Sequence, residues 1–328
     1  MSRINRVISN VIVTGGTGVT GNALVRYLLK NNIKVTAIIR ENSIREKYLP
    51  KGNDNLDIFY CDLGQYELLN DPLKEHIIKH GGYDAFFHLA WEGSKGKEKV
   101  ANRNNFKMQT INVAHAIDAV ELCKSIGCGL FIMTGSQAEY GLRREAATEK
   151  DCKNPVNGYG MAKLCAEGMT RLLCEENKIE HIWPILFSVY GPMDATESMI
   201  DVSVRESLED KYLEYTPGEQ LWNYLYSYDA AKALLLLAEH GQSGESYNVA
   251  SASNRPLREY ISDMYKVIAP KHSPAIGKKQ YSGGVPYPLM ADISKLKADT
   301  GFSEDYSFGK GISEILESVK HERNNTDE

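Results

Sequence analysis

The segment of residues 11–21, VIVTGGTGVTG, constrains the fold of this chain more than any other. A short apolar run rich in β-branched residues is followed by Gly15, Gly18 and Gly21, and then by a pattern typical of a helix. This order predicts a strand, a tight turn and a helix N-terminus. Such a turn can hold a pyrophosphate, since glycine permits the turn, a close backbone approach and tight packing of helix on strand. Alone, the pattern also fits a glycine-rich loop.

Hydrophobic patterns after this turn predict an alternation of strands and helices. Strands are predicted over residues 7–14, 34–39, 56–61, 84–90 and 129–134, and helices over 19–31, 65–80, 105–125 and 157–176. The alternation is typical of the α/β class and predicts a Rossmann-type, doubly wound parallel sheet with helices on both faces. Because such sheets bind ligands at the carboxyl ends of their strands, we expect the residues after each strand to form one rim.

Arg40 follows the second predicted strand, about twenty residues after the glycine turn. In a dinucleotide-binding sheet this position contacts the ribose, and a carboxylate there accepts a hydrogen bond from the 2′-hydroxyl of NAD. A guanidinium instead suits a 2′-phosphate through bidentate hydrogen bonds. The sequence therefore favours NADP over NAD, with a solvated loop cation as the alternative interpretation.

The third and fourth predicted strands are followed by polar or small residues at the same rim. Asp62, which precedes Leu63, can accept a hydrogen bond from an adenine amino group or cap the next helix. Ala90 is small enough for the backbone to pass close to a ribose. His88 lies within an apolar run, so we expect a hydrogen-bonded core histidine rather than a catalytic base.

Tyr159 and Lys163 lie four residues apart at the start of the predicted helix 157–176, so they share one face of it. A cation beside a phenol favours the phenolate and predicts a lowered pKa for Tyr159, within reach of a general acid or base. Ser136, after the fifth strand, places a hydroxyl at the same rim. A tyrosine–lysine pair on a helix surface is the alternative.

Charge and cysteine content exclude several classes of protein. The formal net charge of the 328-residue chain is −5, which argues against nucleic-acid binding but permits a local basic pocket. The six cysteines form no CxxC pair and no zinc-ligand spacing, so we expect free thiols, no metal site and a cytoplasmic location. No apolar run approaches the ~20 residues of a membrane span, and residues 233–238 are expected to form a buried helix segment.

Together these motifs resemble the extended short-chain dehydrogenase/reductase family, in the epimerase and dehydratase group that acts on nucleotide-linked sugars. The resemblance covers essentially the whole chain. It is carried, in chain order, by TGGTGVTG at 14–21, HLA at 88–90, Asn112, Ser136, the YxxxK pair Tyr159 and Lys163, VYGP at 189–192, YNVA at 247–250, DISK at 292–295 and TGF at 300–302.

The resemblance implies roles for these residues. Tyr159 would exchange a proton with a substrate oxygen, Ser136 would hydrogen-bond the same oxygen, and Lys163 would hold the nicotinamide ribose. Asn112 would support the architecture and the proton path. The cofactor-binding residues would be Gly15, Thr17, Gly18, Val19, Gly21, Arg40, Asp62, Leu63, Ala90 and Lys163, and the substrate-binding residues would be Ser136, Gln137, Tyr159 and Trp222.

The resemblance also implies a domain organisation. Residues 1–188 would form the dinucleotide-binding Rossmann domain. Residues 189–328 would mostly form a smaller lobe that binds the nucleotide-linked sugar, with the segment at about 225–250 returning to the sheet. Two molecules would pair in a homodimer through the helices at about 105–125 and 157–176.

Departures from the family pattern bear on the activity. Family dehydratases carry an acidic pair directly after the catalytic hydroxyl, where this chain has Gln137 and Ala138, with Glu139 one position later. Because elimination of water needs an acid and a base besides the tyrosine, a dehydratase is disfavoured. Two family arginines are replaced as well, by Ile185 for packing and by Trp222 at the substrate pyrophosphate. The candidate substitutes for the second are Arg205, Arg255, Arg258, Lys278 and Lys279.

Three functions follow from these features. The first is reduction of the 4-keto group of a nucleotide-linked 6-deoxy sugar with NADPH, which Arg40 favours. The second is a nucleotide-sugar epimerase that retains NAD. The third is a non-catalytic NAD(P)-sensing regulator on the same fold, against which the intact Ser136, Tyr159 and Lys163 argue.

Overall fold

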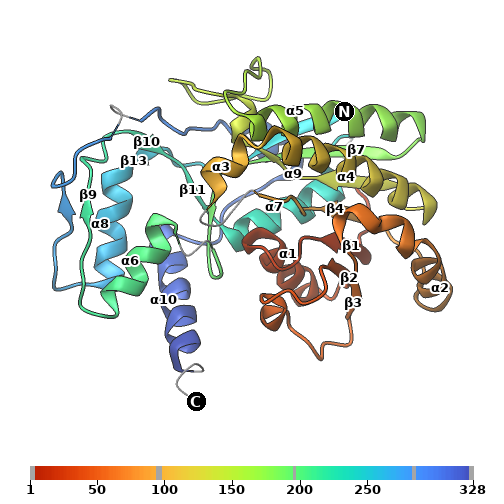
Figure 1. Ribbon diagram of the computed structural model, residues 1–328, viewed down its shortest axis with the longest axis horizontal. Helices are drawn as coiled ribbons and strands as arrows, with labels where there is room; N and C mark the ends of the chain where they lie inside the picture. Colours follow the sequence, from red (N-terminus) through yellow and green to blue (C-terminus); the bar gives the residue numbers. More distant parts are fainter. Residues whose placement is uncertain (1–3, 94–97, 195–196, 283–285, 325–328) are drawn as a thin grey trace.

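The computed structural model describes residues 4–93, 98–194, 197–282 and 286–324. At its centre is a sheet in the order β12-β7-β5-β4-β1-β2-β3, with β6 also paired to β7 (Figure 1). All pairings within this sheet are parallel, which confirms the predicted doubly wound α/β sheet. Its strands are β1 (Asn10–Thr14), β2 (Lys34–Ile39), β3 (Leu56–Tyr60), β4 (Ala85–His88), β5 (Leu130–Met133), β6 (Gly135–Ser136), β7 (Glu180–Leu186) and β12 (Glu245–Val249).

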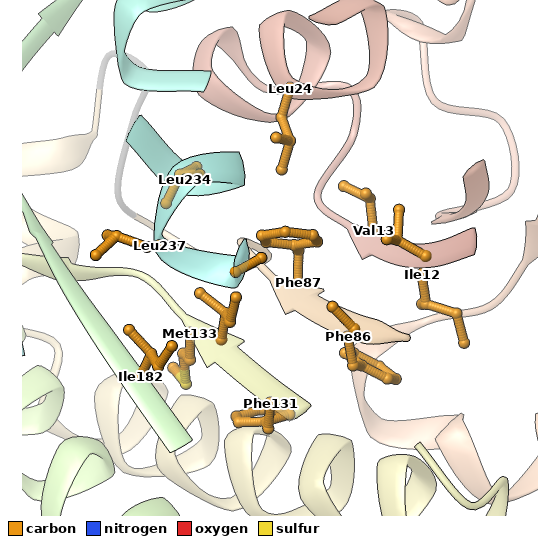
Figure 2. Close-up of a cluster of buried hydrophobic side chains, with 14 of the residues drawn as sticks. Ile12, Val13, Leu24, Phe86, Phe87, Phe131, Met133, Ile182, Leu234 and Leu237 are labelled. Carbon is orange, nitrogen blue, oxygen red and sulfur yellow. The ribbon is translucent and has the colours of Figure 1, made fainter. Parts of the chain in front are cut away.

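Helices cover both faces of the sheet. On one face α1 (Val19–Lys30) packs against α7 (Ser227–His240), and on the other α4 (Phe106–Ser125) packs against α5 (Gly158–Glu176) (Figure 2). Two further helices, α2 (Asn70–His80) and α9 (Ser294–Thr300), complete this part of the chain, and α9 packs on α7. The predicted buried segment 233–238 lies in α7, where Leu234 and Leu237 are fully buried.

The core follows from the two-residue period of the strands. Phe86 and Phe87 are neighbours in β4, so their side chains point to opposite faces of the sheet. Figure 2 shows Phe87 on the side of Leu24 and Leu234, and Phe86 on the opposite side together with Phe131. Each of these side chains is fully buried, and burial of one such side chain stabilises the fold by about 1.5–3 kcal/mol.

A smaller lobe is formed by short strands and three helices. Its strands pair as β8 (Ser188–Tyr190) with β11 (Tyr224–Tyr226), β10 (Leu221–Trp222) with β13 (Arg255–Pro256), and β9 (Glu214–Tyr215) with β14 (Ala275–Ile276). The helices α6 (Met199–Ser207), α8 (Leu257–Ile268) and α10 (Phe308–Asn324) pack on one another around a second hydrophobic cluster.

Most predicted strands and helices shorten by one or two residues at an end, and two predicted elements differ more from the structure. The first strand was expected from residue 7 but begins at Asn10, because Val7 is exposed and the Asp84 carboxylate binds the backbone N–H groups of Ser9 and Asn10. The expected helix 65–80 is divided into a 3₁₀ segment, η2 (Leu63–Leu69), and α2. Non-helical dihedral angles at Gly64 and Gln65 interrupt the first of these.

Three short helices complete the described chain: η1 (Glu46–Tyr48), α3 (Lys99–Arg103) and η3 (Gln137–Glu139). Across the described ranges, no helix combines the length and apolar character needed to cross a bilayer. The same ranges contain no cluster of three or more histidine, cysteine or carboxylate side chains suited to a metal ion. All six cysteines are free thiols.

Candidate active site

The glycine turn joins β1 to α1 at the carboxyl edge of the sheet. Gly15 has a left-handed φ of 72°, and a Cβ there would lie 2.7 Å from the backbone nitrogen of Ala90. A Cβ on Gly21 would lie 2.1 Å from the Gly15 carbonyl oxygen, so α1 packs directly on the turn. Gly18 is the N-cap of α1 and offers no capping side chain, which leaves N–H groups of the first turn for a ligand.

The end of β4 is fixed to the same turn. Thr14 Oγ1 lies 2.8 Å from His88 Nδ1 and also accepts a long hydrogen bond, 3.4 Å, from the backbone N–H of Ala90. His88 is fully buried, and burial lowers its pKa to about 3, so its ring is neutral. The histidine is a hydrogen-bonded core residue, as the sequence predicted.

The other predicted cofactor residues lie at the strand ends on this edge. Arg40 follows β2 and Asp62 follows β3, and both side chains are exposed. Asp62 occupies the N-cap position of η2, but its side chain makes no capping hydrogen bond there. Thr17 and Leu63 are half-buried and Val19 is buried.

Ser136 is held at its position by a buried carboxylate. Glu139 accepts a 2.7 Å hydrogen bond from the Ser136 backbone N–H, and the Ser136 hydroxyl accepts one of 3.2 Å from Ala138 N. Glu139 is fully buried, also binds Lys153 at 3.0 Å, and accepts from the indole N–H of Trp183. Glu139 therefore supports the loop of Ser136.

Tyr159 lies in the first turn of α5, whose N-cap is Asn157 with its side-chain oxygen bound to Gly160 N. Its side chain is buried, and the Ser136 hydroxyl is among the groups that act on its pKa. Burial raises the pKa of Tyr159, an effect opposed by the Ser136 hydroxyl and the charge of Arg103. The expectation that this pKa is lowered is therefore wrong, because burial outweighs the opposing effects of Ser136 and Arg103.

Lys163 extends from the next turn of α5 to the end of β5. Its Nζ donates a 2.8 Å hydrogen bond to the Thr134 carbonyl and lies 3.8 Å from the centroid of the Trp91 ring. The side chain is almost fully buried, and burial lowers the pKa of Lys163 to about 7. The ammonium therefore lies at the rim, beside residues that follow β4 and β5.

Two residues that the sequence did not single out complete this site. Trp91 directly follows Ala90, contacts Lys163, and packs edge-on against Tyr159 with ring centroids 6.1 Å apart. The guanidinium carbon of Arg103 lies 5.3 Å from the centroid of the Tyr159 ring. The only sequence signal for Trp91 was its place after a rim strand, and Arg103 stood in a polar stretch without a pattern.

Asn112 joins α4 to the segment after β4. Its side chain exchanges two hydrogen bonds with the backbone of Glu92, at 2.9 Å and 3.0 Å. Trp91 in turn donates its indole N–H to Gln109 at 2.9 Å. The buried face of α4 therefore positions Trp91 beside Tyr159.

The predicted substrate residues Gln137 and Trp222 lie in different parts of the structure. Gln137 is half-buried directly after Ser136. Trp222 instead belongs to the smaller lobe, where its indole N–H bonds Ser188 Oγ at 3.2 Å and its ring lies 6.3 Å from that of Tyr224. Its contacts with described residues are thus made within the lobe and not with Ser136, Tyr159 or Lys163.

The candidate replacements for the missing arginine are mostly engaged or exposed. Arg205 binds the carboxylates of Asp201 and Glu322, and Arg255 binds Asp263 at 2.8 Å. The remaining candidates, Arg258, Lys278 and Lys279, are exposed. Ile185 is fully buried in β7, as expected for a packing role.

Fold and site together define a dinucleotide-binding protein of the Rossmann type. Residues 11–250 match the NAD dependent epimerase/dehydratase family, and the chain belongs to this family of enzymes. It is 24% identical to a dTDP-glucose 4,6-dehydratase of Haemophilus influenzae over 94% of this chain and 96% of that one. It is also 24% identical to a dTDP-glucose 4,6-dehydratase of Escherichia coli over 94% of this chain and 91% of that one.

Solved structures of similar fold come from the same group. A UDP-glucose 4-epimerase from Thermotoga maritima, solved with UDP-glucose, has a TM-score of 0.80 at 20% identity, over 96% of this chain and 99% of that one. A dTDP-glucose 4,6-dehydratase from Bacillus anthracis, solved in complex with NAD, has a TM-score of 0.78 at 21% identity, over 96% and 98%. At these identities the likeness concerns the fold.

Proposed function

We propose that this protein is an NADP-dependent oxidoreductase that reduces the 4-keto group of a nucleotide-linked 6-deoxy sugar. The observation that carries the proposal is the meeting of Ser136, Tyr159 and Lys163 at the carboxyl edge of the sheet. The Ser136 hydroxyl and the Tyr159 phenol are both buried and act on each other electrostatically, and Lys163 binds the carbonyl of Thr134 in the same rim segment. A phenol, a hydroxyl and an ammonium so arranged suit proton exchange with a carbonyl or alcohol oxygen.

The glycine turn fits a dinucleotide, since a Cβ on Gly15 or Gly21 would collide with backbone and α1 opens with free N–H groups. The bound cofactor supplies or removes a hydride. The protein supplies the proton: Tyr159 gives it to the substrate oxygen, and the Ser136 hydroxyl hydrogen-bonds that oxygen as negative charge develops on it. Lys163 would hold the nicotinamide ribose.

The position of Glu139 favours reduction over dehydration. An eliminating enzyme needs an additional acid and base near the sugar, whereas Glu139 is buried and bound to Ser136 N, Lys153 and Trp183. Arg40 favours NADP because an exposed guanidinium follows β2 where a 2′-phosphate would lie. Net reduction draws on the NADPH pool, so the two features agree.

A nucleotide-sugar epimerase that retains NAD is the second candidate. It is favoured by the solved relatives of similar fold, among which a UDP-glucuronic acid 4-epimerase from Bacillus cereus was solved in complex with NAD. The third candidate, a non-catalytic regulator that senses NAD(P), is disfavoured because Ser136, Tyr159 and Lys163 are all present and buried.

We assign binding of the nucleotide-linked sugar mostly to the smaller lobe within residues 189–328, with Trp222 of this lobe and Gln137 of the larger domain among the contacts of the sugar. We also propose that the chain pairs through α4 and α5 as a homodimer, and acts in a reducing compartment such as the cytoplasm. The apolar side chains exposed on these two helices support the pairing, and the six free thiols support the compartment.

The deciding experiment follows absorbance at 340 nm with NADPH or NADH and a panel of dTDP- and UDP-linked 4-keto-6-deoxy sugars. We expect NADPH to be consumed in equal amount to the sugar. Interconversion of UDP-glucose and UDP-galactose without net change at 340 nm would instead support the epimerase. Absence of both activities, with tight cofactor binding, would support the regulator. A thermal-shift panel of nucleoside diphosphates with NADPH present then identifies the nucleoside.

A further inference from the structure

Two cations and two aromatic rings alternate across the candidate active site. The Arg103 guanidinium lies 5.3 Å from the Tyr159 ring centroid, the Tyr159 and Trp91 rings meet edge-on at 6.1 Å, and the Lys163 ammonium lies 3.8 Å from the Trp91 centroid. The order is therefore Arg103, Tyr159, Trp91, Lys163. Tyr159 has a guanidinium as its cationic neighbour, while the ammonium of its own helix lies against the indole.

Arg103 is held in this place by the packing of α3 on α5, which lie side by side in Figure 1. A Cβ on Gly158 would lie 2.9 Å from the Arg103 carbonyl oxygen, so α5 must begin with glycine for α3 to approach. Asn104, the residue after α3, accepts a 3.1 Å hydrogen bond from Gly158 N. These contacts hold the backbone of Arg103 against Gly158, the residue that precedes Tyr159.

The hydrogen-bonding capacity of the Arg103 guanidinium is not fully used by the described residues. Arg103 is half-buried, and its Nε is shielded from solvent with no hydrogen-bond partner among the described residues. Lys163, in contrast, is committed to the Thr134 carbonyl and the Trp91 face. A positive charge within about 6 Å of a buried phenol stabilises the phenolate relative to the phenol.

We propose that Arg103 is a positioning residue for Tyr159: its guanidinium stabilises the ionised phenol during proton exchange. The proposal rests on the catalytic role given above to Tyr159. Two charged residues act on the ionisation of Tyr159 in opposite directions. Arg103 favours its ionisation, whereas Glu139 of η3, itself bound by Lys153 of the following loop, opposes it.

The test measures the ionisation of Tyr159 directly, without turnover. The protein is labelled with ¹³Cζ-tyrosine, and the Tyr159 resonance is identified by its absence in Tyr159→Phe. Its chemical shift is then followed with pH in the wild type, in Arg103→Met and in Arg103→Lys. We expect the midpoint in Arg103→Met to lie about one pH unit or more above that of the wild type. Arg103→Lys restores part of the difference, because it keeps the charge.

Arg144→Met is the matched control, because Arg144 makes the same kind of contact with Tyr287, 5.4 Å from its ring centroid. It removes an arginine and a cation–ring contact and leaves the Tyr159 resonance unchanged. A Tyr159 resonance that behaves identically in the wild type and in Arg103→Met, whether it titrates or not, overturns the proposal. So does an equal shift in Arg144→Met.

The same variants are then assayed for turnover. Reduction requires protonated Tyr159, so the activity falls as pH rises through its pKa, and this alkaline limb moves to higher pH in Arg103→Met. The two proposals fail separately. If the wild type turns over no nucleotide sugar, the proposed function is lost while the resonance still reports on Arg103. If turnover is present and the resonance is insensitive to Arg103, only the inference about Arg103 is lost.

Discussion

Lys163 places its ammonium 3.8 Å from the centroid of the Trp91 ring, while donating a hydrogen bond to the Thr134 carbonyl at 2.8 Å. Burial destabilises the charged form of an amine, and it lowers the pKa of Lys163 to about 7. The indole face and the carbonyl stabilise the charge that remains.

The first prediction concerns stability against pH. The folded pKa of Lys163 is lowered to about 7, whereas in the unfolded chain it takes the ordinary value of 10.5. Between these values the unfolded chain binds the additional proton, so the free energy of unfolding rises with pH by up to about 1.4 kcal/mol per pH unit from this group. Urea unfolding at pH 7.5 and 9.5 should show this slope in the wild type and lose it in Lys163→Met. An unchanged slope in the variant would contradict the assignment.

The second prediction concerns Tyr159. Tyr159→Phe removes the transferred proton and keeps the ring between Arg103 and Trp91. We expect turnover to fall by at least ~10²-fold with cofactor affinity retained, because the hydroxyl acts in the chemical step. Initial rates and cofactor titration measure the two quantities. Tyr60→Phe, at a half-exposed tyrosine on β3, is the control that keeps full activity. Undiminished turnover in Tyr159→Phe would refute the catalytic role.

The third prediction concerns the glycine turn. Gly21→Ala places a methyl group 2.1 Å from the Gly15 carbonyl oxygen, so the turn or α1 must shift. We expect a loss of about 1–3 kcal/mol in unfolding free energy and weaker cofactor binding. Gly168→Ala is the matched control, because it lies inside α5 with nothing near its Cβ position, and it should stabilise the protein by about 0.5–1 kcal/mol. Chemical denaturation of both variants decides between a packed turn and a permissive loop.

The fourth prediction concerns the choice of cofactor. Arg40 is exposed directly after β2. Arg40→Asp replaces a guanidinium, which suits a 2′-phosphate, with a carboxylate, which suits a ribose 2′-hydroxyl. We expect the wild type to bind NADPH more tightly than NADH, and the variant to reverse the order. Fluorescence titration of both reduced cofactors gives the ratio. Preference for NADH in the wild type would remove the argument for NADP and strengthen that for the epimerase.

The fifth prediction concerns assembly. Ile111 on α4 and Leu172 on α5 are 52% and 58% exposed, together with Phe106, Met161 and Met169 on the same two helices. If these helices pair with a second copy, Leu172→Glu should halve the mass measured by light scattering. Ile78→Glu on α2, at a residue 84% exposed, should leave the mass unchanged. A monomeric wild type would contradict the pairing.

Local pattern explains what sequence analysis could predict. The strand over 34–39 and the helix that carries Tyr159 and Lys163 appear with nearly their expected bounds, since periodic apolar residues and glycine or asparagine boundaries act within a few residues. His88 could be assigned to the core for the same reason, because its neighbours in β4 are all apolar. The family followed from an ordered set of such local motifs.

The contacts of Glu139 and the pKa of Tyr159 could not be predicted from local sequence patterns. Glu139 stood near the position of an acidic pair, but only its burial against Trp183 and Lys153 assigns it to the support of Ser136. The spacing of Tyr159 and Lys163 predicted a lowered pKa, but the pKa of a buried phenol depends on every charge and on solvent around it.

The sequence by itself determined a dinucleotide-binding α/β sheet and the tyrosine, lysine and serine at its rim, because each of these features is encoded within one strand, turn or helix. Only the tertiary structure decided which cation lies beside Tyr159. Arg103 and Trp91 reach it from α3 and from the segment after β4, through packing of segments that are distant in the chain. Contacts of that kind leave no periodic signal in either segment.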